Sequence, residues 1–147
     1  MDDEKEIDLL LIEDSEDDIV FFREALDQAG LRVRMRTARN GAEANQIIFR
    51  NEPLSEAAYP RPKLIVLDLK MPKLNGIDLL ARLKRDQRTS GIPVVIFSSS
   101  QEKRDLTESY RLGANSYLVK PMEAEKFSEA VRLLGLYWLQ LNEIPRP

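Results

Sequence analysis

The chain has 147 residues, a formal net charge of −3, and 43% hydrophobic and 32% charged residues, which is typical of one globular domain over residues 1–147. It contains no cysteine and no histidine, which excludes disulfides, thiolate or imidazole metal ligands, and nucleophiles activated by histidine. The acidic balance argues against nucleic acid or an anionic membrane as a partner. Neither a membrane-spanning run nor a basic secretory signal is present, so we expect a cytoplasmic protein.

Five short aliphatic or alternating runs predict strands, and a pattern with helical spacing follows each of them. The predicted strands are residues 7–12, 33–37, 64–67, 94–97 and 116–119. Ser15, Asn40 and Asn75 precede the first three helices, Ser99 and Glu102 have the spacing of a capping box for the fourth, and the fifth covers about residues 123–141. Residues 50–62 contain three prolines and predict an extended loop. This alternation predicts an α/β fold, with a doubly wound, five-stranded parallel sheet and five helices covering both of its faces.

Polar side chains follow four of the predicted strands. Glu13 and Asp14 follow the first, Asp68 the third, Ser98 the fourth and Lys120 the fifth. Because the carboxyl ends of parallel strands meet at one edge of the sheet, we expect these side chains to lie together. Three ionised carboxylates repel one another unless a cation neutralises them, and Mg²⁺ prefers such oxygen ligands. A hydroxyl and an ammonium group beside them could hold the oxygens of a phosphoryl group.

The motifs that contain these residues resemble the receiver domain of two-component response regulators. The resemblance covers residues 7 to about 141 and implies a flavodoxin-like fold. It rests on the following segments: Leu11-Ile-Glu-Asp14, Leu67-Asp-Leu-Lys-Met-Pro72, Gly76, Pro93-Val-Val-Ile-Phe-Ser98, Gly113-Ala114 and Tyr117-Leu-Val-Lys-Pro121. The long 50–62 segment and the aromatic Leu136-Tyr-Trp-Leu139 are similar to single-domain regulators associated with phytochromes.

The resemblance implies a role for each acidic residue. Asp68 would accept a phosphoryl group, and Glu13, Asp14 and Asp68 would bind Mg²⁺ together with the backbone carbonyl of Lys70. Because the chain has no histidine, the phosphohistidine donor must belong to another molecule, which would be a sensor histidine kinase such as a phytochrome. The protein would then be a phosphoacceptor and not an enzyme, apart from its self-catalysed phosphorylation and dephosphorylation.

The same resemblance implies a switch. Ser98 and Lys120 would each hold one phosphoryl oxygen, and the Lys120–Pro121 peptide bond would be cis. Movement of Ser98 would let Tyr117 turn inward, which would remodel the surface formed by the fourth helix, the fifth strand and the fifth helix.

Output must come from another molecule or from self-association, because no output domain follows the predicted receiver. Leu136, Tyr137 and Trp138 lie in an apolar segment that covers more than one face of the last helix. We therefore expect a homodimer through this helix. The alternative is that the 50–62 segment folds over the same surface and covers it.

The sequence also bears on two alternative functions. A Mg²⁺-dependent phosphohydrolase with Asp68 as nucleophile would place a second aspartate two residues later, where this chain has Lys70. An interaction module that has lost phosphorylation would lack an acidic residue or the lysine, and all of them are present. No glycine-rich nucleotide-binding motif follows the first predicted strand.

Overall fold

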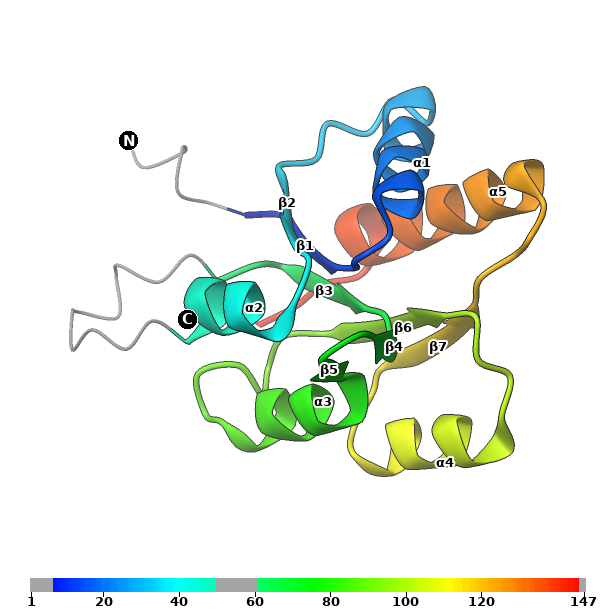
Figure 1. The fold of residues 1–147 in the computed structure, drawn as a ribbon. Helices are drawn as coiled ribbons and strands as arrows, with labels where there is room; N and C mark the ends of the chain where they lie inside the picture. The colour runs from blue at the N-terminus through cyan, green and yellow to red at the C-terminus, as the bar shows by residue number, and fades with distance from the viewer. Residues whose placement is uncertain (1–6, 50–60, 146–147) are drawn as a thin grey trace.

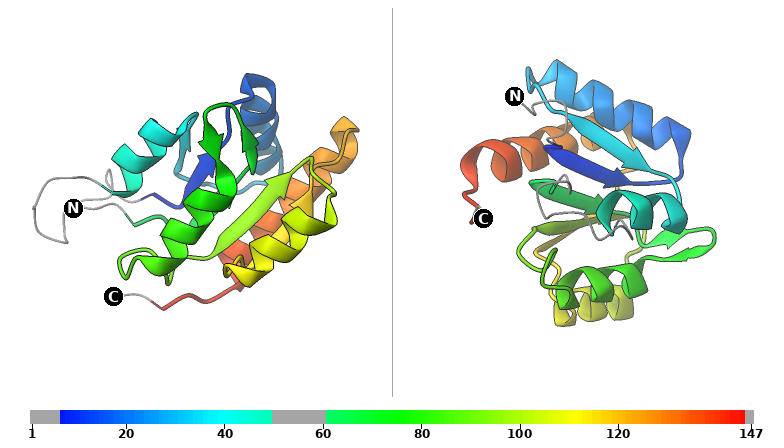
Figure 2. Two further views of the ribbon diagram at one scale, coloured as in Figure 1. Left: turned by 60° about the horizontal axis from the view of Figure 1, so that its bottom comes forward. Right: turned by 90° about the vertical axis from the view of Figure 1, so that its left-hand side faces the viewer.

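A computed structural model describes residues 7–49 and 61–145 of the chain. Its main sheet has five parallel strands in the order β2-β1-β3-β6-β7, with helices on both faces (Figures 1 and 2). The strands are β1 (Leu9–Ile12), β2 (Met35–Ala38), β3 (Leu64–Leu67), β6 (Val94–Ser98) and β7 (Ser116–Val119). The helices are α1 (Glu16–Gln28), α2 (Gly41–Ile48), α3 (Gly76–Arg85), α4 (Lys103–Arg111) and α5 (Ala124–Gly135). Most of the predicted 50–62 loop lies outside the described residues.

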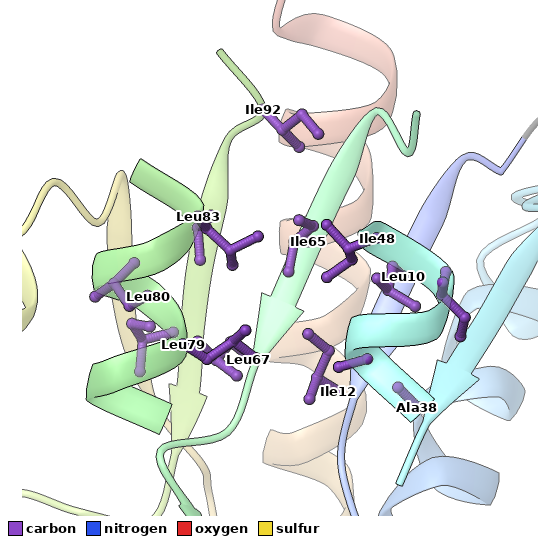
Figure 3. Close-up of a cluster of buried hydrophobic side chains, with 14 of the residues drawn as sticks. Leu10, Ile12, Ala38, Ile48, Ile65, Leu67, Leu79, Leu80, Leu83 and Ile92 are labelled. Atoms are coloured by element: carbon purple, nitrogen blue, oxygen red, sulfur yellow. The ribbon is translucent and has the colours of Figure 1, made fainter. Parts of the chain in front are cut away.

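Strand β3 is buried on both faces, as its unbroken aliphatic run predicts. Alternate side chains point to opposite faces of a strand, so Leu64 and Val66 join the core beneath α1 and α5. Ile65 and Leu67 join the core beneath α2 and α3, where Figure 3 shows them facing side chains of those helices. The two cores fix the sheet between its helices and thereby fix where each strand ends.

Three of the predicted helix starts agree with the structure, and the fourth does not. Ser15, Asn40 and Asn75 each accept a hydrogen bond from the first turn of the following helix. The prediction that Ser99 caps α4 was wrong, because Ser99 is exposed and α4 begins after Glu102 without a side-chain cap. Because a bend at Ser99 and three residues without regular secondary structure separate β6 from α4, this helix starts too late for Ser99 to cap it.

The last helix changes its winding where it passes α1. Helix α5 continues as a π-helical segment, η3 (Leu136–Leu141). A Cβ at Gly135 would lie 2.8 Å from the Leu31 side chain and 2.9 Å from the Leu26 side chain, so glycine lets the helix lie against these side chains without displacing them. Trp138 packs partly on the core, whereas Tyr137 is half exposed. Within the described residues, no helix is both long enough and apolar enough to cross a membrane.

Candidate functional site

The carboxyl ends of β1, β3, β6 and β7 converge on one polar site. Ile12 lies level with Leu67 in the sheet, so the next residues, Glu13 and Asp68, emerge side by side. Carboxylate oxygens of Glu13, Asp14 and Asp68 lie within 4.8 Å of one another. Glu13 and Asp68 are buried, whereas Asp14 is more open to solvent. The structure therefore brings together the three acidic residues that the sequence singled out.

Lys120 reaches into this acidic cluster from the end of β7. Its Nζ lies 2.6 Å from Glu13 Oε2 and 3.0 Å from Asp68 Oδ2. Burial raises the pKa of the Glu13 carboxyl to about 7, although the hydrogen bond from Lys120 opposes that rise. Burial alone would lower the pKa of Lys120, but the hydrogen bond to Glu13 and the charge of Asp68 outweigh it and raise the pKa. The metal-free site thus holds a charged lysine among crowded carboxylates.

A fourth carboxylate, which the sequence analysis did not assign to the site, also contacts Lys120. Asp18 Oδ2 lies 2.9 Å from Lys120 Nζ. Asp18 stands in the first turn of α1, where acidic residues are common for reasons of helix stability. The spacing from Ser15 is equally typical of a cap, so no signal in the sequence alone distinguished the two roles.

A short hairpin that the sequence analysis missed shapes the chain after Asp68. Strands β4 (Lys70–Met71) and β5 (Leu74–Asn75) pair antiparallel across a turn in which Lys73 has φ of 62°. The backbone N–H of Lys70 donates to Asp68 Oδ1 at 3.1 Å. A Cβ at Gly76 would lie 2.6 Å from Leu69 Cα and 2.9 Å from the Asp68 carbonyl oxygen. Gly76 therefore lets α3 start directly against the backbone that carries Asp68.

Ser98 is linked to α4 and to Tyr117 through Ser100. The Ser100 backbone N–H donates to Ser98 Oγ at 3.3 Å, and the Tyr117 hydroxyl donates to the Ser100 carbonyl at 2.8 Å. Burial raises the pKa of that Tyr117 hydroxyl. The Ser100 hydroxyl donates to Asp105 Oδ2 at 2.5 Å and accepts from the Glu102 backbone N–H at 3.3 Å. Ser100, and not the predicted Ser99, therefore joins the end of β6 to the start of α4.

The prediction of a cis peptide bond between Lys120 and Pro121 was wrong. No peptide bond among the described residues is cis, so the Lys120–Pro121 bond is trans. The trans form is favoured by about 0.5–1 kcal/mol for a bond before proline. Lys120 makes its contacts to the buried carboxylates from this trans bond, so reaching them does not require the cis form.

The donor set suits a hard divalent cation. Glu13, Asp14 and Asp68 offer only carboxylate oxygens, and these oxygens are close enough together to share one ion. Such oxygen ligands are typical of Mg²⁺ and Mn²⁺ sites. A cation would also relieve the repulsion among the three charges.

Comparison with known proteins identifies the class. Residues 9–132 match the family described as the response regulator receiver domain, so the chain belongs to that family of two-component signalling proteins. The predicted five-stranded, flavodoxin-like receiver fold is confirmed by its likeness to a solved response regulator, the phosphorylated cyanobacterial phytochrome response regulator RcpA. That likeness has a TM-score of 0.87 at 32% identity and covers 96% of this chain and 99% of RcpA.

Two further similar proteins are a response regulator and a regulatory protein of methanogenesis. The Mn²⁺-bound structure of the response regulator Rcp1 is 30% identical, with a TM-score of 0.85, over 94% of this chain and 98% of that chain. A protein of that name comes from Synechocystis. The probable methanogenesis regulatory protein FilR2 of Methanothrix harundinacea is 32% identical over 95% of this chain and 88% of its own length. The predicted resemblance to phytochrome-associated regulators is confirmed by the likeness to RcpA.

Proposed function

We propose that Asp68 accepts a phosphoryl group from the phosphohistidine of a sensor histidine kinase, such as a phytochrome. The observation that carries this proposal is the position of Asp68, which is 6% exposed at a strand end and lies 3.0 Å from a lysine ammonium. A carboxylate oxygen of Asp68 would attack phosphorus as the bond from phosphorus to the imidazole nitrogen breaks. The phosphoryl group then resides on Asp68, and the electron pair of the broken bond stays with the kinase histidine.

The cation in this proposal is Mg²⁺. Glu13, Asp14, Asp68 and the backbone carbonyl of Lys70 would hold it. When bound, the ion neutralises charge on the transferring phosphoryl group. The clustered carboxylate oxygens support this assignment, and the structure of the similar protein Rcp1 is described as Mn²⁺-bound.

Ser98 and Lys120 would stabilise the phosphoryl oxygens. The Ser98 hydroxyl is fully buried at the end of β6, and the Lys120 ammonium already contacts the acceptor carboxylate. A hydroxyl donor and an ammonium aimed at developing negative charge stabilise the transition state of such a transfer. Lys70, two residues after Asp68, makes a salt bridge of 3.7 Å to Glu102. The ammonium group of Lys70 cannot replace the aspartate that acts as acid and base in a phosphohydrolase, so we favour the phosphoacceptor function.

Transfer would be read out on the surface of α4, β7 and α5. A hydrogen bond from Ser98 to a phosphoryl oxygen would compete with its contact to Ser100, and Ser100 also holds Tyr117 and the start of α4. This surface exposes apolar side chains at Leu106, Tyr110 and Val119. A change in the position of Tyr117 and α4 would alter how these side chains are presented to a partner.

The proposed output is a homodimer, with a separate protein target as the alternative. Tyr137 and Leu141 in η3 are 50% and 73% exposed, and Leu133 of α5 is 53% exposed. An exposed apolar strip on one helix suits a symmetric contact with a second copy of the chain. We further propose that the protein acts in the cytoplasm, where the kinase domain of a sensor would meet it.

Beryllofluoride, a phosphoryl mimic, tests both steps of this proposal. With Mg²⁺ present, it should bind the wild-type protein and not Asp68→Asn, as measured by calorimetry. Size-exclusion chromatography with light scattering should then show a larger mass for the wild type alone. Equal binding by both proteins would contradict the Asp68 assignment. Binding without a change in mass would contradict phosphorylation-dependent dimerisation and leave a separate protein target as the output.

A further inference from the structure

The Lys120 ammonium has three carboxylate partners, and one of them comes from helix α1. Its Nζ lies 2.6 Å from Glu13, 2.9 Å from Asp18 and 3.0 Å from Asp68. A lysine ammonium carries three N–H donors, so these three carboxylates can engage all of them. The Lys120 side chain is 12% exposed and that of Asp18 is 31% exposed. The contact with Asp18 therefore lies at the mouth of the site, between α1 and the loop that follows β7.

The side chain of Asp18 does not serve the start of its own helix. Asp18 stands three residues after Ser15, the position from which a side chain can return to the backbone N–H of the capping residue. In this structure the Ser15 N–H donates to Glu13 Oε1 at 3.1 Å instead. Ser15 Oγ accepts from the Asp18 backbone N–H at 3.3 Å, which does not depend on the Asp18 side chain. The carboxylate of Asp18 is thus directed to Lys120.

The other two partners of Lys120, Glu13 and Asp68, also take part in the proposed reaction. Glu13 and Asp68 belong to the cluster of oxygens that suits a divalent cation, and within the described residues this cluster includes Asp14 but not Asp18. When a cation binds and Asp68 becomes phosphorylated, Glu13 and Asp68 must share their negative charge with the metal and the phosphoryl group. Asp18 is not expected to bind the metal or the phosphoryl group, so its full negative charge remains available to Lys120.

We propose that Asp18 is a positioning residue, which anchors the Lys120 ammonium at the phosphoacceptor site while Glu13 and Asp68 engage the cation and the phosphoryl group. This inference rests on the proposed function of Asp68. A lysine side chain is a point charge on a flexible stem, and small misplacements of a charged group can cost much of its effect on a transfer. Helix α1 is a firm base for the anchor, because Ile19 and Phe22 bury its inner face.

The first test compares Asp18→Asn with Asp17→Asn. Asp17 is exposed in the same helical turn, so the control removes the same charge from the same end of α1. With a small acyl phosphate donor and saturating Mg²⁺, Asp18→Asn should be phosphorylated several-fold more slowly than Asp17→Asn, since asparagine can still accept a hydrogen bond from Lys120 but lacks the charge that roughly doubles its strength. The Mg²⁺ dissociation constants of the two variants should agree within about twofold. Equal phosphorylation rates, or a loss of Mg²⁺ affinity that accounts for the slower rate, would overturn the inference.

The second test does not depend on phosphorylation. An amine-acylating reagent, followed by mass spectrometry of the peptide that contains Lys120, measures how firmly the ammonium is held. Labelling of Lys120 should rise several-fold in Asp18→Asn and not in Asp17→Asn, and the rise should be larger with Mg²⁺ than with a chelator. If the wild type takes up no phosphate but the variants differ in labelling as expected, the proposed function of Asp68 is refuted and the anchoring role of Asp18 is supported. If the wild type is phosphorylated but the two variants are labelled equally, only the anchoring role of Asp18 is refuted.

Discussion

Replacing Lys120 by methionine should destabilise the metal-free protein strongly. The side chains of Glu13 and Asp68 are only 3% and 8% exposed, and Lys120 contacts both. Methionine keeps an unbranched apolar side chain but removes the charge, so both carboxylates lose a buried partner. Breaking a buried ion pair from one side typically costs about 3–5 kcal/mol of the free energy of unfolding. Because the pKa of Glu13 is already about 7, this carboxyl can take up a proton, and we expect a cost near 3 kcal/mol.

The pH dependence follows from the direction of the Glu13 pKa shift. Its pKa is raised from 4.5 to about 7 in the folded protein. The folded state therefore binds the proton more tightly than the unfolded state, and the Glu13 contribution to stability falls as pH rises through that window. Loss of Lys120, whose hydrogen bond lowers this pKa, extends the decline to higher pH. The gap between variant and wild type should be wider at about pH 8 than at about pH 6.

Thermal unfolding followed by circular dichroism measures this effect. In a chelator the midpoint of Lys120→Met should fall by about 10 °C for a chain of this size. Excess Mg²⁺ binds the folded site and restores positive charge, so it should close at least half of that gap. Lys126→Met is the control, because Lys126 is 71% exposed and its salt bridge to Glu123 spans 3.8 Å; its cost should stay within about 0.5 kcal/mol. Equal midpoints for the two variants in chelator, or a gap unchanged by Mg²⁺, would refute the reasoning.

Two further substitutions test the backbone around the site. Ser100→Ala removes the hydroxyl that joins β6 to α4, so amide hydrogens in the first turn of α4 should exchange about tenfold faster. Ser99→Ala, at an exposed neighbour, should leave that exchange unchanged, and similar rates in both variants would contradict the role of Ser100. Gly76→Ala should lower the free energy of unfolding by about 1–3 kcal/mol in chemical denaturation, because its Cβ would lie 2.6 Å from Leu69 Cα. Gly91→Ala meets open space and should not be destabilising; a Gly76→Ala protein as stable as Gly91→Ala would contradict the packing argument.

The strands and the convergence of the site could be predicted from the sequence. An unbroken aliphatic run such as residues 64–67 is typical of a strand in a parallel sheet that is covered on both faces, and the structure shows all four side chains buried. In a parallel sheet, topology alone places residues that follow different strands at one edge. For this reason Glu13, Asp68 and Lys120, which are far apart in the sequence, were expected to meet, and they do.

The sequence did not predict which of several similar side chains makes a given contact, because the three-dimensional path of the chain decides it. Ser98, Ser99 and Ser100 offer three equivalent hydroxyls, and only the path of the chain after β6 decides that Ser100 turns inward while Ser99 faces solvent. Asp18 has a spacing that fits a helix cap as well as an ion pair, and the position of Lys120 decides between them. The π-helical end of the last helix begins directly after Gly135, and no local pattern in the sequence marks it.

The central claim is that Asp68 accepts the phosphoryl group, and incorporation of labelled phosphate tests it most directly. The wild type, Asp68→Asn and Asp78→Asn would each be incubated with Mg²⁺ and a labelled acyl phosphate, and the label would be located by mass spectrometry. Asp78 lies exposed on α3 and controls for the loss of one acidic charge. We predict one phosphoryl group on the wild type and on Asp78→Asn, located at Asp68, and none on Asp68→Asn. Undiminished labelling of Asp68→Asn, or no labelling of the wild type, would contradict the proposed function.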